Sequence, residues 1–425
     1  MSNFLKISIL LFVLVYFNGQ VNGQTFQFIN GNWFNGKSFK KQTFYAVNGL
    51  FSTKKPIQID RVFDLQNGFV IPPFADAHCH HFDGAYNLAQ QVNMYLKDGV
   101  FYAKVQTNVK SGAAQTKSKV NLPKSVDVSF SHGALTHTHG HGIEVYESLA
   151  LGFYNEKYNE NLSKIAASRI RENDAYYIID TAQDLENKWQ KIVDGKPDFI
   201  KIYLLTSEDF ADNRQKIPNI PLGSIGIDPK LVPSIVEKAH QAGLKVSAHV
   251  DTLFDYQTAL NAGVDEMAHL PGYYVGLNDK LEKYLLTEEV VKESARRKIW
   301  IVPAPIAHGQ IDPETRKKTD LALKHNLSLL KKHKVKIAFG SDRYGSTPLN
   351  DVLYLQKLEI FSNLEMLKIW SEETPLAIFP NQKIGQLKDN YEASFIVLAE
   401  NPINNFEAVK NITFRFKQGQ LIQVQ

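Results

Sequence analysis

Two hydrophobic patterns alternate through the middle of the chain. Segments in which apolar residues return every three or four positions predict helices, and a short segment typical of a strand follows each of them. One unit shows both patterns, since Asp228 and Pro229 suit the start of its helix and Gly243 suits its end, after which polar and apolar residues alternate. Repeated units of this kind predict a parallel sheet. We expect an α/β fold in which residues 69–383 close into a TIM (β/α)8 barrel.

The two ends of the chain differ from this middle region. Residues 24–68 and 384–425 contain short alternating apolar runs separated by turn residues such as Asn48-Gly49. Two strand-rich ends around a long middle region predict one small β-sandwich domain assembled from both termini.

The N-terminus has the layout of a targeting segment. Lys6 precedes an apolar run at residues 7–17, and small or permissive residues follow at 21–23. This predicts a secretory signal peptide at residues 1–23 and export to the periplasm or the outside of the cell. The alternative is an N-terminus that packs on the core or stays disordered. A helix that crosses a bilayer needs about 20 apolar residues, and no run is that long, so we expect no membrane span.

Composition narrows the possible partners. The 425-residue chain has a net charge of +4 with 22% charged residues, which gives no reason to expect nucleic acid or a membrane surface as a partner. Its single cysteine, Cys79, excludes an intramolecular disulfide.

Side chains that bind metals lie where several predicted strands end. Asp76, His78 and His80 close the first apolar strand, and a period of two places them on one face. The two imidazoles then form a chelating pair, which Asp76 can support by hydrogen bonding. Cys79 points the other way and is interpreted as a small buried residue.

Later strands carry further candidates. His249 and His269 each follow a glycine by six residues in successive units, so we expect them side by side on neighbouring strands. Lys201 lies within an apolar strand, where an ammonium is costly unless a carboxylate pairs with it or the amine is chemically altered. Asp342 ends the last strand, and the active sites of TIM barrels lie at such strand ends.

The order of these residues resembles that of the amidohydrolase superfamily, in its prolidase-like and imidazolonepropionase-like branch. The resemblance covers nearly the whole chain after the signal peptide, and it rests on Asp76 to His80, Phe199 to Ile202, His249, His269 and Gly340 to Asp342.

This resemblance implies a centre of two divalent metal ions, with zinc as the first choice. The implied ligands are His78, His80, Lys201, His249, His269 and Asp342. The first two histidines and the aspartate would hold one ion, and the other two histidines the second. A carbamate formed from CO₂ on the lysine would bridge both. A bridging hydroxide would attack the substrate, with Asp342 as the catalytic group that moves its proton.

Three more residues are candidates for substrate binding. His141, within Gly-His-Gly, resembles a loop residue that polarises the substrate carbonyl in prolidase-like members. Tyr273 lies in the loop after His269, and Arg343 can bind a carboxylate with two parallel hydrogen bonds. The structural alternatives are a solvated histidine-rich loop, an aromatic packing contact and a salt bridge, respectively.

Together these features favour a metal-dependent hydrolase that cleaves an amide bond in a small molecule, a dipeptide or an N-acyl amino acid. Two alternatives stay open: hydrolysis of a lactone or phosphoester on the same binuclear site, and a metal-binding protein without catalysis. The sequence leaves open the substrate, the metal and whether the chain forms a homo-oligomer.

Overall fold

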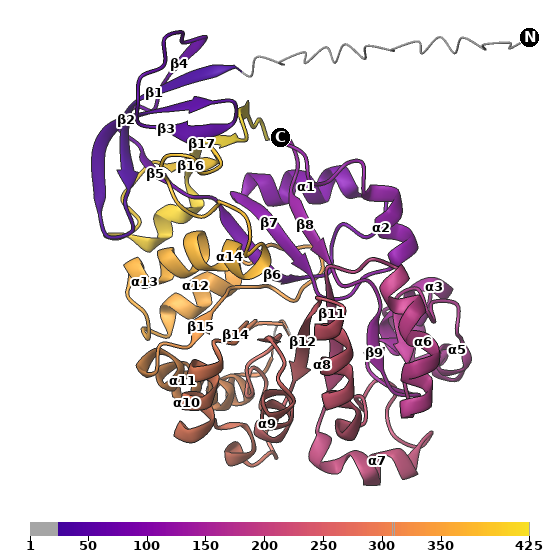
Figure 1. Ribbon diagram of the computed structural model, residues 1–425. Coiled ribbons are helices and arrows are strands. Elements are labelled where there is room, and N and C mark those ends of the chain that lie inside the picture. Colours follow the sequence, from indigo (N-terminus) through magenta and orange to yellow (C-terminus); the bar gives the residue numbers. More distant parts are fainter. Residues whose placement is uncertain (1–23, 308, 310, 425) are drawn as a thin grey trace, which may run out of the picture.

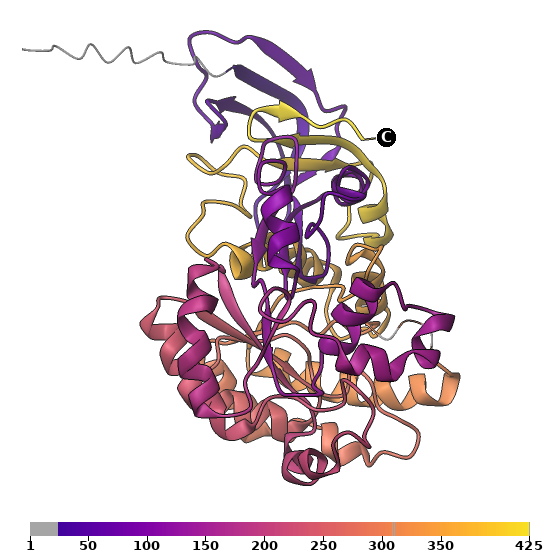
Figure 2. The same cartoon turned by 90° about the vertical axis from the view of Figure 1, so that its right-hand side faces the viewer.

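The computed structural model describes residues 24–307, 309 and 311–424. The expected signal peptide, residues 1–23, lies outside the described residues. The described residues form a large α/β barrel and a small β domain at one end of it (Figures 1 and 2). Both termini of the described chain run through the β domain, in indigo and yellow, which confirms the expected α/β fold with a small domain built from both ends.

The wall of the barrel has eight positions, filled by short parallel strands. β8 and β9 share the third position, because β8 pairs with β7 and β9 pairs with β11 after a turn. The barrel closes where the backbone N–H of Ala77 donates to the carbonyl of Phe339 at 2.8 Å. In chain order the strands are β6 (Phe74–Cys79), β7 (Val100–Val105), β8 (Asp127–Phe130), β9 (Ala134–Thr136), β11 (Phe199–Leu204), β12 (Lys245–Val250), β13 (Glu266–Met267), β14 (Trp300–Ile301) and β15 (Lys336–Ile337).

Helices surround this wall on the outside (Figure 1). Those that follow the barrel strands are α1 (Leu88–Lys97), α2 (Lys110–Thr116), α6 (Ala182–Asp194), α8 (Val232–Gln241), α9 (Leu253–Ala262), α10 (Glu288–Arg297), α11 (Pro313–Lys332) and α12 (Leu349–Lys357). An insertion between β9 and α6 adds α3 (Ile143–Leu151), α4 (Glu156–Glu160), α5 (Leu162–Ala167) and an extra strand, β10 (Tyr176–Ile178). Beyond these, α7 (Phe210–Lys216) follows β11, and α13 (Asn363–Lys368) and α14 (Thr374–Ile378) lead back to the β domain.

Alternation along β11 and β12 decides which side chains face the barrel interior. Ile202 and Ala248 belong to the apolar core shared with the outer helices. Their neighbours Lys201 and Ser247, which pair across the two strands, therefore face inward. His249 lies two residues after Ser247 and so shares its side of the sheet, as the sequence predicts.

The β domain is one eight-stranded sheet that curls around an aromatic core. Its strands are β1 (Thr25–Phe34), β2 (Phe39–Val47), β3 (Leu50–Ser52), β4 (Arg61–Asp64), β5 (Phe69–Ile71), β16 (Phe395–Leu398), β17 (Ile412–Lys417) and β18 (Gln420–Leu421). β3 and β16 lie four places apart in the sheet, yet the rings of Phe51 and Phe395 are only 6.0 Å apart. The two facing layers of the expected sandwich are thus two parts of one sheet. β5 pairs with β1 and β16, so this domain extends to Ile71, past the expected boundary at residue 68.

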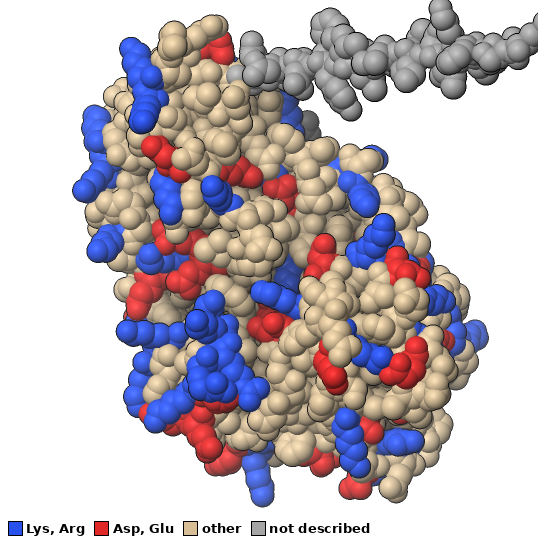
Figure 3. Space-filling view, viewed as in Figure 1, with Lys and Arg blue, Asp and Glu red and all other residues tan. Residues whose placement is uncertain are grey.

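Charges of both signs are interspersed over the face seen in Figure 3, with a denser group of lysines and arginines at its lower left. In the part of the chain that the structure describes, no helix is both long enough and apolar enough to cross a bilayer.

Candidate metal centre

His78 and His80 point into the barrel mouth, but Asp76 does not. Between Asp76 and Cys79, β6 advances three residues while β7 advances two, which is a β-bulge. The bulge turns Asp76 to the side of Cys79, where its carboxylate accepts a hydrogen bond of 2.9 Å from the hydroxyl of Tyr95 on α1. The expectation that Asp76 shares a face with both histidines is therefore wrong, because strict alternation holds only where the strand is regular.

The two histidines are held so that their Nε2 atoms face Asp342. The Nδ1 atom of His78 lies 2.8 Å from the carbonyl oxygen of Ala268, and that of His80 lies 3.3 Å from the carbonyl oxygen of Thr107. A carbonyl only accepts, so each Nδ1 carries a proton, and in a neutral imidazole the Nε2 then carries a lone pair. These Nε2 atoms lie 3.0 Å and 2.8 Å from the same oxygen of Asp342, Oδ1.

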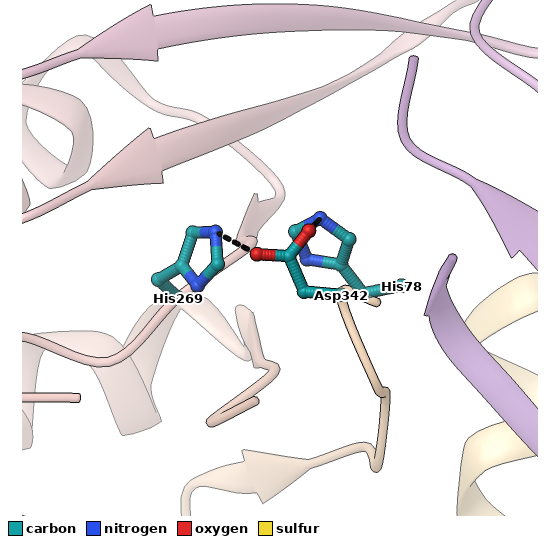
Figure 4. Close-up of side chains that lie close together, drawn as sticks. All are labelled: His78, His269 and Asp342. Atoms are coloured by element: carbon teal, nitrogen blue, oxygen red, sulfur yellow. Dashed lines mark ion pairs between the residues drawn. The ribbon is translucent and has the colours of Figure 1, made fainter. Parts of the chain in front are cut away.

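Two imidazole lone pairs that converge on one carboxylate oxygen repel it unless a cation lies among them. Burial lowers the pKa of His78 to about 4, even though Asp342 favours the charged form, so this imidazole is neutral near pH 7. One oxygen of Asp342 and one nitrogen each of His78 and His269 also lie within 4.8 Å of one another (Figure 4). The donor set fits a divalent metal ion.

A tight turn after β15 brings Asp342 to this place. The backbone N–H groups of Ser341 and Asp342 donate to the carbonyl of His78 at 3.0 Å and 2.7 Å, and Asp342 adopts a positive φ of 49°. The hydroxyl of Ser341 donates to Asp76 at 2.9 Å, which links the first and last barrel strands. Burial works against a charge on Asp342, but His78 and His269 hold the pKa of this carboxyl well below its usual range.

Gly340 leaves the room that this turn needs. A Cβ at Gly340 would lie 2.7 Å from both the Cβ and the backbone nitrogen of His78. Gly340→Ala should therefore displace His78, lower the free energy of unfolding by about 1–3 kcal/mol and weaken metal binding about 10- to 100-fold. Thermal unfolding and metal titration measure both effects. Gly84→Ala is the matched control because a Cβ there meets nothing within 4 Å; a comparable loss in the control would contradict the steric explanation.

His249 and His269 lie side by side at the ends of neighbouring strands, with ring centroids 4.4 Å apart. The Nε2 atom of His269 is 3.4 Å from Oδ2 of Asp342, and its Nδ1 is buried without a hydrogen-bond partner in the described chain. The Nε2 of His249 hydrogen-bonds Asp251 at 3.0 Å, which leaves its Nδ1 as the lone-pair atom. Asp251 also accepts a hydrogen bond of 3.0 Å from the hydroxyl of Tyr273.

Lys201 lies below these histidines, and its amine has no hydrogen-bond partner among the described residues. The side chain is 1% exposed, and this burial lowers its pKa to about 7 although Asp342 and Glu266 favour the ammonium. Glu266 cannot neutralise it directly, because Lys104 binds both oxygens of Glu266 at 2.8 Å and 2.9 Å. Of the two possibilities that the sequence leaves open, pairing of Lys201 with a carboxylate is therefore not what the structure shows.

The three residues expected to bind substrate differ in their contacts with the site. His141 packs against the mouth, with its ring 5.1 Å from that of His249, and its Nδ1 is 2.9 Å from Glu144. Tyr273 stacks on His269 at 4.3 Å, so its ring is part of the wall. Arg343 is half-buried, and no ion pair within the described residues holds its guanidinium.

Several residues of the site were not singled out from the sequence. Asp251 follows His249 by two positions, a spacing that puts both on one strand face, so this signal was present. Tyr203 also follows Lys201 by two positions; its ring lies 4.6 Å from that of His141, and its hydroxyl lies 3.0 Å from that of Thr107. The carbonyls that orient His78 and His80 leave no sequence signal, because any residue supplies one.

Known proteins resemble the chain in sequence and in fold. No family model matches the chain. A stretch of 204 residues is 29% identical to ochratoxinase from Aspergillus niger, and it covers 46% of this chain and 41% of that enzyme. The match thus spans less than half the length of this relative.

Solved structures resemble the chain over nearly its whole length. The crystal structure of A. niger ochratoxinase has a TM-score of 0.71 with 17% identity and covers 95% of this chain and 96% of that one. A prolidase complexed with N-methylphosphonate-L-proline has a TM-score of 0.68 with 17% identity, covering 95% and 100%. A Xaa-Pro dipeptidase with bound methionine has a TM-score of 0.68 with 15% identity, covering 94% and 100%. In fold, the chain is similar to amidohydrolases, among them a prolidase and ochratoxinase, and part of its sequence is distantly similar to that of ochratoxinase.

Proposed function

We propose that this protein is a metal-dependent hydrolase that cleaves an amide bond in a dipeptide or an N-acyl amino acid. One observation carries the proposal: the Nε2 atoms of His78 and His80 converge on Asp342, and the buried amine of Lys201 has no hydrogen-bond partner among the described residues. An apolar interior would not keep such groups together without cations. The prolidase and the Xaa-Pro dipeptidase among the similar structures favour amide bonds as the target.

Two divalent ions, zinc first, would be held by the six side chains. His78, His80 and Asp342 suit one ion, and the neighbouring pair of His249 and His269 suits the other. When bound, such ions would supply Lewis-acid polarisation of the scissile carbonyl and an activated water near neutral pH.

Lys201 would join the two halves of the centre as a carbamate. Burial lowers the pKa of this amine to about 7, which favours the free amine, and the free amine is the form that adds to CO₂. The free amine forms an N–C bond with CO₂ and releases one proton, which turns a neutral group into an anion; counted from the ammonium, two protons are released. This change removes the cost of burying an ammonium where Lys104 already occupies Glu266.

The remaining residues suit an acyl-transfer reaction. Asp342 is positioned as the base that takes the proton of the attacking water and passes it to the leaving amine. His141 and Tyr203 present a ring nitrogen and a hydroxyl at the mouth, where they can donate to the carbonyl oxygen of the substrate as charge develops on it. Arg343, free of ion pairs within the described chain, can bind a carboxylate of the substrate. After export by the signal at residues 1–23, the reaction would take place in the periplasm or outside the cell.

Metal removal combined with a substrate screen tests this function. The zinc-loaded protein should contain about two ions per chain and hydrolyse dipeptides or N-acyl amino acids. Dialysis against a chelator should abolish hydrolysis and lower the melting temperature, because the converging lone pairs lose their cations, and zinc should restore both. Metal analysis, melting curves and amine release are the measurements. If the protein hydrolyses lactones or phosphotriesters and no amide, the alternative reaction on the same site would be the correct one. Full metal occupancy without any turnover would favour a non-catalytic metal-binding protein.

A further inference from the structure

Lys104, Lys201 and Glu266 are all buried in the barrel interior below the metal centre. They come from three different strands, β7, β11 and β13. Two amines share one carboxylate here, so only one of them can form a buried ion pair with it. The choice between the two lysines therefore decides which amine stays unpaired.

Glu266 is paired with Lys104, and further contacts fix this choice. The Lys104 ammonium lies 2.9 Å and 2.8 Å from the two carboxylate oxygens. The side-chain amide of Gln106 and the hydroxyl of Ser247 each donate to Oε1 of Glu266 at 2.8 Å. The ammonium also lies over the ring of Phe199, 4.1 Å from its centroid, which favours a cation at this place. Burial works against a charge on Glu266, but Lys104 holds the pKa of this carboxyl below its usual range.

Lys201 lies near enough to compete for the same carboxylate. Lys201 pairs with Ser247 across β11 and β12, and Ser247 pairs with Glu266 across β12 and β13. Neighbouring strands are spaced by about 4.8 Å, so the backbones of Lys201 and Glu266 are about 10 Å apart, a span that two long side chains can bridge. The amine of Lys201 nevertheless has no hydrogen-bond partner among the described residues. The strand order thus permits a Lys201–Glu266 pair, and Lys104 prevents it.

We propose that Lys104 is a positioning residue for the metal centre: by holding Glu266, it keeps the amine of Lys201 free to become the bridging group. This inference rests on the proposed function and names a residue that controls its bridge. Without Lys104, the carboxylate of Glu266 pairs with Lys201. An ammonium held in such a pair neither binds a cation nor adds CO₂, because both need the lone pair of the nitrogen.

Replacing Lys104 by an uncharged side chain of similar length tests this role. In Lys104→Met, Glu266 is released to Lys201, so the zinc-loaded full chain should bind about one ion or fewer, or bind the second about 10- to 100-fold more weakly. The carbamate signal in ¹³C NMR after incubation with labelled bicarbonate should be lost as well. The double variant Lys104→Met/Glu266→Gln has no carboxylate to offer, so it should regain about two ions and the signal.

Melting of the metal-free protein reports the pairing itself, without any metal or activity. In the parent, Lys201→Ala should change the melting temperature little, because the amine has no partner in the described residues. In the Lys104→Met background, the same substitution should lower it by about 5 °C, since it then leaves the buried Glu266 without a cation. A purely structural role of Lys104 does not predict this dependence of one lysine on the other.

Lys417→Met is the matched control. Lys417 is also buried, and it is bonded to Asp127 at 2.8 Å, at the start of β8 and away from the mouth. This variant should melt at a lower temperature, because it leaves a buried carboxylate without its cation. It should still bind about two ions, and Lys201→Ala should have as little effect on its metal-free melting as in the parent.

Two ions retained by Lys104→Met, or an equal loss of ions in the single and double variants, would overturn the role of Lys104. If Lys104→Met does not fold, the double variant and Glu266→Gln decide: both lack the carboxylate, and a folded one without the paired ions would contradict the proposal. A parent that never binds two ions would reject the proposed centre. The metal-free melting would still show which lysine Glu266 pairs with.

Discussion

Lys201→Ala should lose the paired metal centre and almost all hydrolysis. The bound metal should fall from about two ions per chain to one or fewer, and kcat/KM should fall at least about 1,000-fold, which corresponds to about 4 kcal/mol. The reason is that the amine of Lys201 is the group that can become an anion between the two sets of histidines, while Glu266 stays bound to Lys104. Metal analysis of the purified variant and steady-state kinetics measure these losses.

Melting curves separate loss of the bridge from misfolding in this variant. The metal-free parent buries an amine without a partner in the described residues, so Lys201→Ala should change the melting temperature of the metal-free protein little. The variant should lose most of the increase in melting temperature that zinc gives the parent. Lys245→Ala is the control, since Lys245 is exposed and begins β12 at the far end of the barrel from the mouth. Two ions retained by Lys201→Ala would refute the bridging role.

Asp342→Asn should remove catalysis while leaving part of the metal site. The amide has the shape of the carboxylate but not its charge, so it can neither balance a cation beside His78 and His80 nor take a proton from water. We expect a loss in kcat/KM of about 1,000-fold or more and about 10- to 100-fold weaker binding of one ion. A zinc titration followed by both occupancy and rate is the measurement.

Excess zinc distinguishes the two roles of Asp342. Occupancy should return at high zinc, and activity should not, because the proton acceptor is still missing. Asp198→Asn is the control: Asp198 accepts a hydrogen bond of 2.7 Å from the backbone of Phe130 just before β11, at the opposite end of the barrel. Recovery of full activity with zinc would show that Asp342 is only a ligand.

Local rules predicted much of the fold correctly. Asp228 caps a short helical turn that starts at Pro229 and continues into α8, and Gly243 adopts a positive φ of 73° after it. His249 and His269 each follow a glycine by six residues, and this spacing correctly predicted that they lie side by side. These predictions succeed because capping, alternation and repeat length depend on neighbours within a few residues.

Other features of the site depend on contacts between distant segments. The bulge in β6 turns Asp76 away from the histidines because β6 must pair with β7 and also support the turn at Ser341. Whether a carboxylate pairs with Lys201 depends on Lys104, which lies 97 positions earlier and forms an ion pair with Glu266. No periodicity in the chain encodes which of two buried lysines receives the one carboxylate.

By itself, the sequence determined the barrel units, the β-rich ends and the types of side chain available at the strand ends, since these follow from short-range patterns of polarity and backbone preference. Only the tertiary structure decided which nitrogen of each histidine faces inward and which of two buried lysines pairs with Glu266. Those outcomes depend on burial and on carbonyls, hydroxyls and carboxylates supplied by segments far away along the chain, and the free energy of such contacts exists only once the chain has folded.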